Sequence, residues 1–504
     1  GPLRLREKAL AAIDATRWVP ERGRNRIRSM IETRPDWCIS RQRAWGVPIA
    51  VFVHRGTGEV LRDPAVVERI ATAFEAEGAD AWFTHEPQEF LGPGYDPADY
   101  EKVDDIVDVW FESGSTHAIV LEKRPDLRSP ASLYLEGSDQ HRGWFQSSLL
   151  LSLAGHGAPP YRTVLTHGFM VDADREKISK SKQGQGGYEK PQTSEAYVKE
   201  HGADVVRLWV ASQDFRNDIV VSQERIKTVG ETYRMIRNAL RYQLSNLFDF
   251  DPARHGVPDA QLTGLDRWIL SEFARLEAEV LAAYEGYEFH VVYQKLSQFA
   301  AVELSAIYHD IIKDRLYTDA ANTPRRRSTQ TALHRLVTGL CQMLSPLLTF
   351  TADEAWEFIP HRGGVSSVHL ATWKPSALVR SEAEQTAWRR LFELRALVLP
   401  ELEKERQAKR IGKSLEARVI ITGSNPMLAD AKTHLESLRE LLNVSQLEVH
   451  HAPNGTDVAI QVARALGQKC ERCWHWEEDV GEETAHPTIC GRCVEAVQAG
   501  NSGG

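Results

Sequence analysis

The sequence has no long apolar run and no excess of basic residues. A membrane-spanning helix needs about 18 to 20 apolar residues in succession, and no segment approaches this length. The N-terminus also lacks the charged and then apolar pattern of a signal peptide, so we expect a cytoplasmic protein. Acidic residues outnumber basic ones, 70 to 61, which gives a formal net charge of -9 and excludes a uniformly basic nucleic-acid coat. Any RNA must therefore be bound at local basic surfaces.

Cysteine is scarce along most of the chain and concentrated near its end. Cys38 and Cys341 stand alone, and we expect both to be buried small apolar residues. The other four form two Cys-x2-Cys knuckles separated by sixteen residues: Cys470, Cys473, Cys490 and Cys493. Two such knuckles supply the four thiolates of a tetrahedral zinc site, although a redox dithiol or a disulfide is an alternative. We predict one structural Zn2+.

Two tryptophans lie beside the first knuckle. Trp474 and Trp476 could cover a small core, or an exposed indole could stack on an unpaired base. We expect packing for at least one of them. His475 and His486 are interpreted as ordinary polar residues, because four thiolates already complete the zinc shell.

The chain of 504 residues is long enough for three to four domains of about 150 residues each. Between residues 36 and 222 short apolar runs alternate with helical stretches, which predicts an α/β architecture. The helix Trp144–Leu153 is expected after the third strand, and the Pro- and Gly-rich segment 61–100 is interpreted as an insertion. The expected strands are Val47–Val53, Ile106–Phe111, Leu133–Leu135 and Thr163–Val171.

After residue 222 the apolar period changes to three or four residues, which predicts a helical bundle. A small α/β piece with strands at Arg418–Thr422 and Gln446–Val449 is expected next, and the cysteine-rich end follows. The basic run Arg325 to Arg327 is placed between helices, where it could face RNA phosphates or be a solvated loop. The helical stripes begin at Ile226 and recur at Leu265–Tyr284, Phe289–Ile311, Leu333–Leu347 and Trp388–Leu402.

Two segments of the α/β part could bind a ligand. Lys177-Ile-Ser-Lys180-Ser-Lys182 and the glycines after it suit a phosphate clamp, although a solvated loop has the same composition. The second segment, 135–144, runs from a strand through a polar turn into a helix, where small ligands bind in open sheets. Its His141 could be a general base or a hydrogen-bonded structural histidine.

These segments closely resemble those of the bacterial isoleucyl-tRNA synthetases, a family of class I aminoacyl-tRNA synthetases. The resemblance covers nearly the whole chain. It implies the second half of a Rossmann-type nucleotide-binding domain, an all-α anticodon-binding bundle, a small α/β junction and a C-terminal zinc module. Its carriers are the motifs at 36–48, 108–115 and 136–145, the Lys-Ile-Ser-Lys-Ser loop, 202–204, 310–315 and the four-cysteine end.

The resemblance also implies a domain division and a reaction. The family activates isoleucine with ATP and Mg2+ to isoleucyl-adenylate and then transfers the acyl group to the matching isoleucine tRNA. The implied divisions are 1–60 (return from the editing insertion), 61–100 (small insertion), 101–222 (second half of the catalytic domain), 223–400 (anticodon bundle), 401–465 (junction) and 466–500 (zinc module).

Roles carry over by matching residues to the family motifs. Lys180, supported by Lys177, would steady the triphosphate as charge builds on the leaving pyrophosphate. Trp110 and Trp144 resemble walls of the amino-acid pocket. The adenylate would be bound by Glu136, Gly137, Asp139 and Gln140.

The chain departs from the family pattern at three places. Ile178 stands where Met is common, a volume-conserving change, and the loop from Lys182 to Pro191 is richer in glycine. The family's His-x-Gly-His motif is absent. The chain also starts with Gly1 rather than Met, so we interpret it as a portion whose first half-fold and editing region lie elsewhere. We expect it alone neither to activate isoleucine efficiently nor to hydrolyse mischarged valine.

Two other readings remain. A non-catalytic tRNA-binding paralogue would keep the bundle and zinc module, but it would not need Glu136 and Lys180, which are present. A valyl- or leucyl-type synthetase fragment would share the architecture, but the 108–115 stretch and the four-cysteine end are isoleucine-type.

Overall fold

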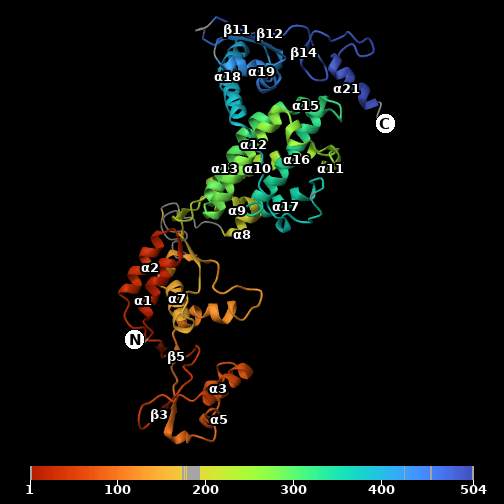
Figure 1. The fold of residues 1–504 in the computed structure, drawn as a ribbon. Helices are drawn as coiled ribbons and strands as arrows, with labels where there is room; N and C mark the ends of the chain where they lie inside the picture. The colour runs from red at the N-terminus through yellow and green to blue at the C-terminus, as the bar shows by residue number, and fades with distance from the viewer. Residues whose placement is uncertain are drawn as a thin grey trace, which may run out of the picture. The chain divides into compact units, whose positions relative to one another are not determined.

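The computed structural model describes residues 3–172, 175, 178, 193–361, 363–424, 426–453 and 457–501. The chain forms two compact units, Gly1–Ile178 with Phe215–Val220 and Ser179–Asp214 with Val221–Gly504. Figure 1 shows the course of the chain through both. Among the described helices, none is long and apolar enough to cross a membrane.

The first unit is built on a three-stranded parallel sheet. The strands lie in the order β1-β7-β6, and Val164 of the central strand pairs with Trp18 on one side and Tyr134 on the other. Helix α7 covers the sheet with Phe145 and Leu149, which are fully buried. The elements of this layer are α1 (Leu5–Ala15), β1 (Arg17–Val19), α2 (Arg22–Glu32), β6 (Tyr134–Gly137), η3 (Ser138–His141), α7 (Trp144–Gly155) and β7 (Thr163–His167).

The segment expected as an insertion, 61–100, forms a core together with the strands on either side of it. Trp82, Phe52 and Phe90 are buried against one another, and the Trp82 indole donates to the Val103 carbonyl. The segment contains α3 (Pro64–Glu77), α4 (Ala81–Thr84), α5 (Pro87–Leu91) and η1 (Pro97–Asp99), and the flanking strands β3 (Phe52–His54) and β4 (Tyr100–Lys102) pair antiparallel.

Several strand predictions are wrong in extent. Of the expected strand Val47–Val53 only the end is extended in a ladder, as β3. The expected strand Ile106–Phe111 stops after β5 (Ile106–Val107), because the Asp108 carboxylate accepts from Trp110 N and caps helix α6 (Val109–Gly114). The remaining short elements of this unit are β2 (Ser40–Arg41), η2 (His117–Leu121), β8 (Met170–Val171) and β9 (Ile219–Val220).

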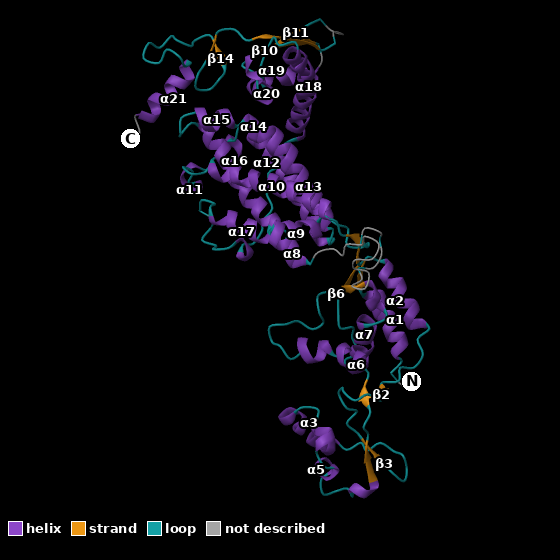
Figure 2. Cartoon of the chain, turned by 180° about the vertical axis from the view of Figure 1, so that it is seen from behind, coloured by secondary structure: helices purple, strands orange, loops and turns teal. Residues whose placement is uncertain are grey.

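The second unit is mostly helical (Figure 2). The predicted long helices are confirmed, and the stretch Phe289–Ile311 is helical throughout but passes through a π-helical segment, η6 (Ala300–Tyr308). The helices are α8 (Ser194–His201), α9 (Ala203–Ala211), α10 (Gln223–Ser245), α11 (Pro252–His255), η5 (Asp259–Gln261), α12 (Gly264–Glu285), α13 (Phe289–Phe299), α14 (His309–Ile311), α15 (Lys313–Thr318), α16 (Pro324–Leu344), α17 (Thr349–Glu357), η7 (Val368–Leu370) and α18 (Glu382–Gln407).

A small α/β piece and the cysteine-rich end follow. The sheet order is β11-β10-β12, with the expected strands β10 and β11 parallel and an additional strand, β12, antiparallel to β10. The elements are η8 (Ser414–Glu416), β10 (Ala417–Gly423), α19 (Pro426–Thr433), α20 (Leu435–Leu442), β11 (Gln446–His451), β12 (Ala459–Arg464), β13 (Gln468–Lys469), β14 (Trp476–Glu477) and α21 (Gly491–Asn501).

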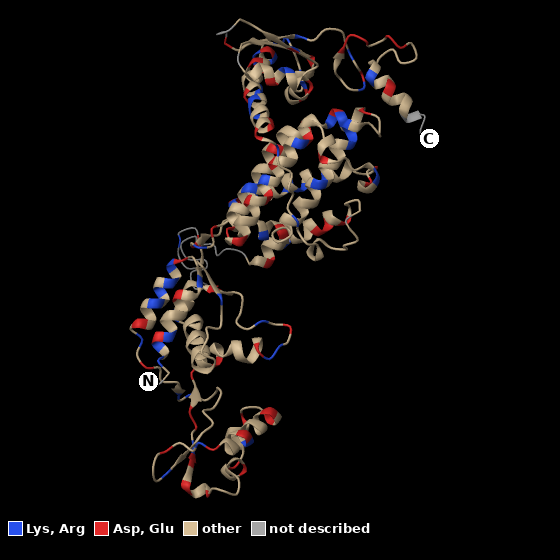
Figure 3. Ribbon diagram, viewed as in Figure 1, with Lys and Arg blue, Asp and Glu red and all other residues tan. Residues whose placement is uncertain are grey.

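Two expectations about single residues are wrong. Arg325, Arg326 and Arg327 do not form a loop between helices but the first turn of α16, where the ribbon is dense in basic positions (Figure 3). Arg326 and Arg327 are buried and do not face solvent, and both pair with Asp249, which compensates their charge. Cys341 is buried as expected, but Cys38 is exposed.

Candidate functional site

The predicted adenylate-facing turn lies at the carboxyl end of β6. Glu136 is exposed in the strand, and the chain turns at Gly137 into η3. The Gln140 side-chain oxygen accepts from Trp144 N at 3.0 Å, which fixes the turn to the start of α7. A Cβ at Gly143 would lie 2.5 Å from the Gln140 oxygen, so this close approach requires glycine. The turn is therefore held from both ends while Glu136 is open to solvent.

The two predicted pocket tryptophans lie beside this turn but differ in exposure. Trp144 stacks on Tyr134 with ring centroids 4.1 Å apart, and its indole donates to the Ser113 carbonyl at 2.8 Å. Trp110 is 40% exposed, and its ring faces Gly143. Trp144 is thus largely part of the support, whereas Trp110 offers a free aromatic face.

His141 occupies a structural position. Its side chain is buried, and Nδ1 donates to the Ser138 carbonyl at 2.7 Å. Burial lowers the pKa of His141 below its ordinary value, although the hydrogen bond to Ser138 opposes the shift. The imidazole packs between Trp18 and Phe145, as the structural alternative requires, while its Nε2 has no hydrogen-bond partner among the described residues and His141 lines the cavity described next.

A cavity of about 370 Å³ opens where all three parallel strands end. Thr166 and His167 come from the end of β7 and Ser138 follows β6, while Arg22 and Arg26 come from the first turns of α2 after β1. Open parallel sheets bind ligands at this edge, and a helix N-terminus with guanidinium groups favours anions.

Sequence reasoning missed the basic lining of this cavity. Arg22 and Arg26 are four residues apart and so share one face of α2, a signal that could have been read once β1 was known. Arg216, which also lines the cavity, is distant in sequence and could not. Lys177 and Lys180 lie outside the described residues.

The four predicted zinc ligands come together at the C-terminal end. Their Sγ atoms all lie within 4.8 Å of one another, and all four residues are buried. Tetrahedral zinc with Zn–S bonds of about 2.3 Å places its sulfur ligands about 3.8 Å apart. The Cys473 and Cys490 sulfurs are 3.8 Å apart. The cluster therefore fits one structural Zn2+.

A cleft of about 680 Å³ lies beside the zinc cluster. Trp474, which lines it, is 54% exposed and has a left-handed backbone (φ 67°), a strained conformation for a bulky residue that is typical of functional positions. The ammonium groups of Lys413 and Lys469 lie 5.3 and 5.7 Å from its ring. Trp476 is instead half-buried under Arg464. One tryptophan packs and the other is exposed between cations.

The chain matches three family models in order. Residues 3–222 match the class I tRNA synthetases for I, L, M and V, residues 266–421 match the anticodon-binding domain of tRNA ligases, and residues 467–496 match a zinc finger found in FPG and IleRS. The third match contains the four cysteines of the cluster.

Curated relatives agree with these models. The isoleucine–tRNA ligase of Geobacter sulfurreducens is 46% identical over 514 residues, which cover 98% of this chain and 54% of that protein. That of Thioalkalivibrio sulfidiphilus is 47% identical over 510 residues, 98% of this chain and 53% of that protein. A solved methionyl-tRNA synthetase of Mycobacterium tuberculosis matches with a TM-score of 0.48 and 18% identity, over 70% of this chain and 60% of that one.

The chain spans about half the length of the curated relatives that it matches. Within that span the relatives, the ordered family models and the four-cysteine cluster agree, and on these grounds the chain belongs to the isoleucine–tRNA ligase family of class I tRNA synthetases.

Proposed function

We propose that this chain supplies half of a divided active site that activates isoleucine with ATP and Mg2+ and transfers it to isoleucine tRNA. The observation that carries the proposal is the rigid turn at the end of β6, which holds Glu136 exposed at the carboxyl edge of a parallel sheet. Ligands of doubly wound folds bind at this edge.

The exposed edge of β6 supports a second half-fold. In the described part of the chain the sheet ends at β6, and Leu135 on that strand is 52% exposed. A parallel strand is normally buried on both faces. A partner that carries the His-x-Gly-His half would cover Leu135 and complete the site around Glu136.

The proposed reaction has two steps. A carboxylate oxygen of isoleucine attacks the α-phosphorus of ATP, the bond to the bridging oxygen breaks, and pyrophosphate leaves. The terminal ribose hydroxyl of the tRNA then attacks the acyl carbon, and AMP leaves. We assign adenylate binding to Glu136, Gly137, Asp139 and Gln140. Of the two predicted walls of the amino-acid pocket, we assign the exposed face to Trp110 and the support behind it to Trp144.

We assign stabilisation of the negative charge on the leaving group to lysine and arginine side chains. Lys180, with Lys177, would offset the charge on the leaving pyrophosphate. Arg22 and Arg26 at the start of α2 add positive charge at the same edge of the sheet. A divided site explains why we expect no efficient activation by this chain alone.

We assign tRNA binding to the bundle (223–400) together with the junction (401–465) and the zinc module (466–500). The exposed indole of Trp474 between Lys413 and Lys469 suits a stacked base whose phosphates meet the ammonium groups. Stacking of this kind contributes about 1 to 3 kcal/mol per base.

The test is isoleucine-dependent exchange of labelled pyrophosphate into ATP, with the chain alone and after addition of the family's N-terminal half. We expect exchange only after addition, and its loss in Glu136→Gln. Glu101→Gln, at an exposed position of β4, is the matched control and should retain exchange.

Exchange by the chain alone would refute the divided site. Valine or leucine supporting faster exchange than isoleucine would refute the assigned substrate. No exchange in either case, together with specific tRNA binding, would favour the non-catalytic alternative.

A further inference from the structure

Each zinc knuckle carries an arginine between its two cysteines. Arg472 lies in the first knuckle and Arg492 in the second. Both reach the same short segment of the bundle, α15: Arg472 donates to the Thr318 carbonyl, and Arg492 binds Asp314. The fold around the metal therefore presents two guanidinium groups to one helix.

The contact to Asp314 has the geometry of a strong ion pair. Arg492 donates to both carboxylate oxygens, at 2.6 and 2.8 Å, and Arg325 lies 3.2 Å from the same side chain. Burial alone would raise the pKa of Asp314, but its hydrogen bonds and charge interaction with Arg492, aided by His475 and Arg325, hold the pKa well below its usual range. Bidentate pairs of this kind fix orientation as well as distance.

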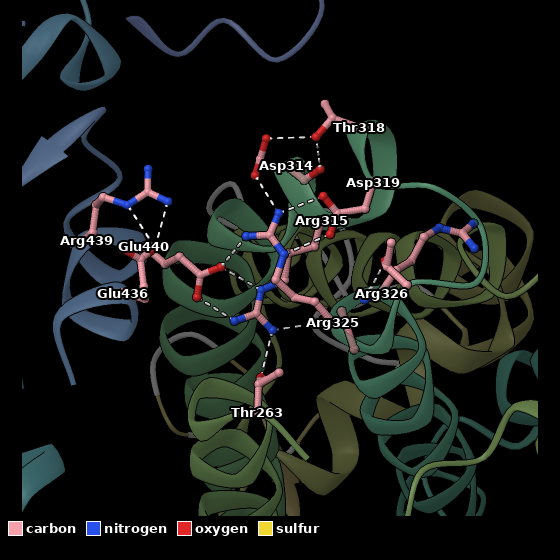
Figure 4. Close-up of polar contacts among 12 residues, drawn as sticks. Thr263, Asp314, Arg315, Thr318, Asp319, Arg325, Arg326, Glu436, Arg439 and Glu440 are labelled. Atoms are coloured by element: carbon pink, nitrogen blue, oxygen red, sulfur yellow. Dashed lines mark hydrogen bonds and ion pairs between the residues drawn. The ribbon is translucent and has the colours of Figure 1, made fainter. Parts of the chain in front are cut away.

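Arg315, the next residue along the chain, connects the bundle to the α/β piece. Arg315 binds the carboxylate of Glu440 on α20 through two hydrogen bonds (Figure 4). Its other terminal nitrogen binds Asp266 of the bundle. Arg325 contacts both Asp319 and Glu440. Segment 314–315 thus joins the bundle to the zinc module on one side and to the α/β piece on the other.

The cleft around Trp474 depends on this junction. Its lining comes from all three parts: Tyr317 from the bundle, Lys413 from the start of the α/β piece, and Trp474 from the zinc module. None of these side chains defines the cleft alone. A shift of the zinc module relative to α15 would therefore change the width of the cleft.

We propose that Asp314 is a positioning residue, which holds the zinc module against α15 through Arg492 and so sets the Trp474 cleft for a nucleotide base. This inference rests on the RNA-binding role proposed above. Asp314 itself lies in the lining of the cleft, and its carboxylate is held by Arg492, Arg325 and Thr318. Its proposed effect on the base is exerted through Arg492, which fixes the position of the module that carries Trp474.

The first experiment needs no RNA. The rate of Zn2+ release to a chelator is measured in the wild type, Asp314→Asn, Arg492→Gln and the double variant, after each is shown to start with one bound Zn2+. We expect release to be about tenfold faster in each single variant, since a hydrogen bond to a charged group is lost, and no further increase in the double variant. The control Asp259→Asn breaks an ion pair with Arg335 elsewhere in the bundle and should leave the rate unchanged.

The second experiment measures affinity for an isoleucine tRNA transcript in the same variants and in Trp474→Ala. We expect Asp314→Asn and Arg492→Gln each to weaken binding about tenfold without adding to each other. Arg492→Lys keeps the positive charge but loses the two parallel hydrogen bonds of the guanidinium group, so it should bind the tRNA more tightly than Arg492→Gln and less tightly than the wild type.

The outcomes separate the two proposals. Unchanged zinc release in Asp314→Asn overturns the anchoring role, and so does a variant that cannot bind Zn2+ at all. Normal RNA affinity in Asp314→Asn, while Trp474→Ala binds weakly, overturns positioning and leaves the RNA cleft standing. Normal affinity in Trp474→Ala refutes the RNA cleft, and zinc release alone then decides whether Asp314 anchors the module.

Discussion

Replacing Arg315 by methionine should open the contact between the bundle and α20. The side chain is 3% exposed. It makes two hydrogen bonds to Glu440, at 2.8 and 2.5 Å, and contacts Asp266 at 3.1 Å. Methionine fills much of the same volume, so the change removes charge and hydrogen bonds more than packing.

The expected loss of stability depends on the partners that Asp266 and Glu440 keep after the substitution. Removing one partner of a buried ion pair costs about 3 to 5 kcal/mol, because the other charge stays buried without compensation. Here Asp266 keeps the hydroxyls of Tyr308 and Ser328, at 2.6 and 2.5 Å, and Glu440 keeps Arg325 at 3.1 Å. We therefore expect the lower end, about 3 kcal/mol.

Amide hydrogen exchange is the suitable assay, since a chain with two compact units need not unfold in one step. In Arg315→Met the amides of α20 should exchange more than about a hundredfold faster, as a loss of 3 kcal/mol in opening free energy requires. The half-exposed Arg335, paired with Asp259, gives the control Arg335→Met, which should cost less than about 1 kcal/mol. Equal exchange of α20 in both variants would refute this account of the junction.

Three further predictions concern the bundle and the metal. Burial lowers the pKa of His309 to about 3, so below pH 6.5 the unfolded chain binds a proton that the folded chain does not. This histidine should lower the free energy of unfolding by about 1.4 kcal/mol per pH unit from 6.5 down to the folded pKa. In unfolding measured from pH 6.5 to 4.5, His309→Gln should reduce the pH slope by this amount. A Cβ at Gly339 would lie 2.7 Å from the Phe273 ring, so Gly339→Ala should lower the denaturation midpoint by the equivalent of about 1 to 3 kcal/mol. A Cβ at Gly230 would lie 3.8 Å from its nearest neighbour, so Gly230→Ala should raise the midpoint. Equal midpoints in the two variants would contradict the packing argument. Removal of Zn2+ should unfold the knuckles, seen as rapid exchange near Cys490, and leave the circular dichroism of the bundle nearly unchanged.

The parts of the fold that local pattern encodes could be predicted from the sequence. The knuckles follow from spacing alone, and the long helices follow from their apolar period. Strand β1 has only three residues, with one buried side chain, Trp18, and so carries no period to detect. The strand expected at Ile106–Phe111 failed because Asp108 is a cap, and a cap outweighs a short apolar run.

Long-range partners account for the other failures. Arg326 and Arg327 look like a solvated run, because their partner Asp249 is 77 and 78 residues away. The exposure of Cys38 likewise depends on how its neighbours pack and not on the residue type. For the candidate site, the turn at Glu136 and the four cysteines could be predicted, whereas the cavity lining from α2 and the junction at Asp314 required the tertiary fold.

The edge of β6 bears on how this chain behaves in solution. A strand whose backbone N–H and C=O groups face outward, with an apolar side chain such as Leu135 beside them, is a template for any extended segment. At high concentration that segment will be another copy of the chain, and self-association will compete with the proper partner strand. Supplying the partner during refolding should therefore raise the yield of monodisperse protein as well as complete the sheet.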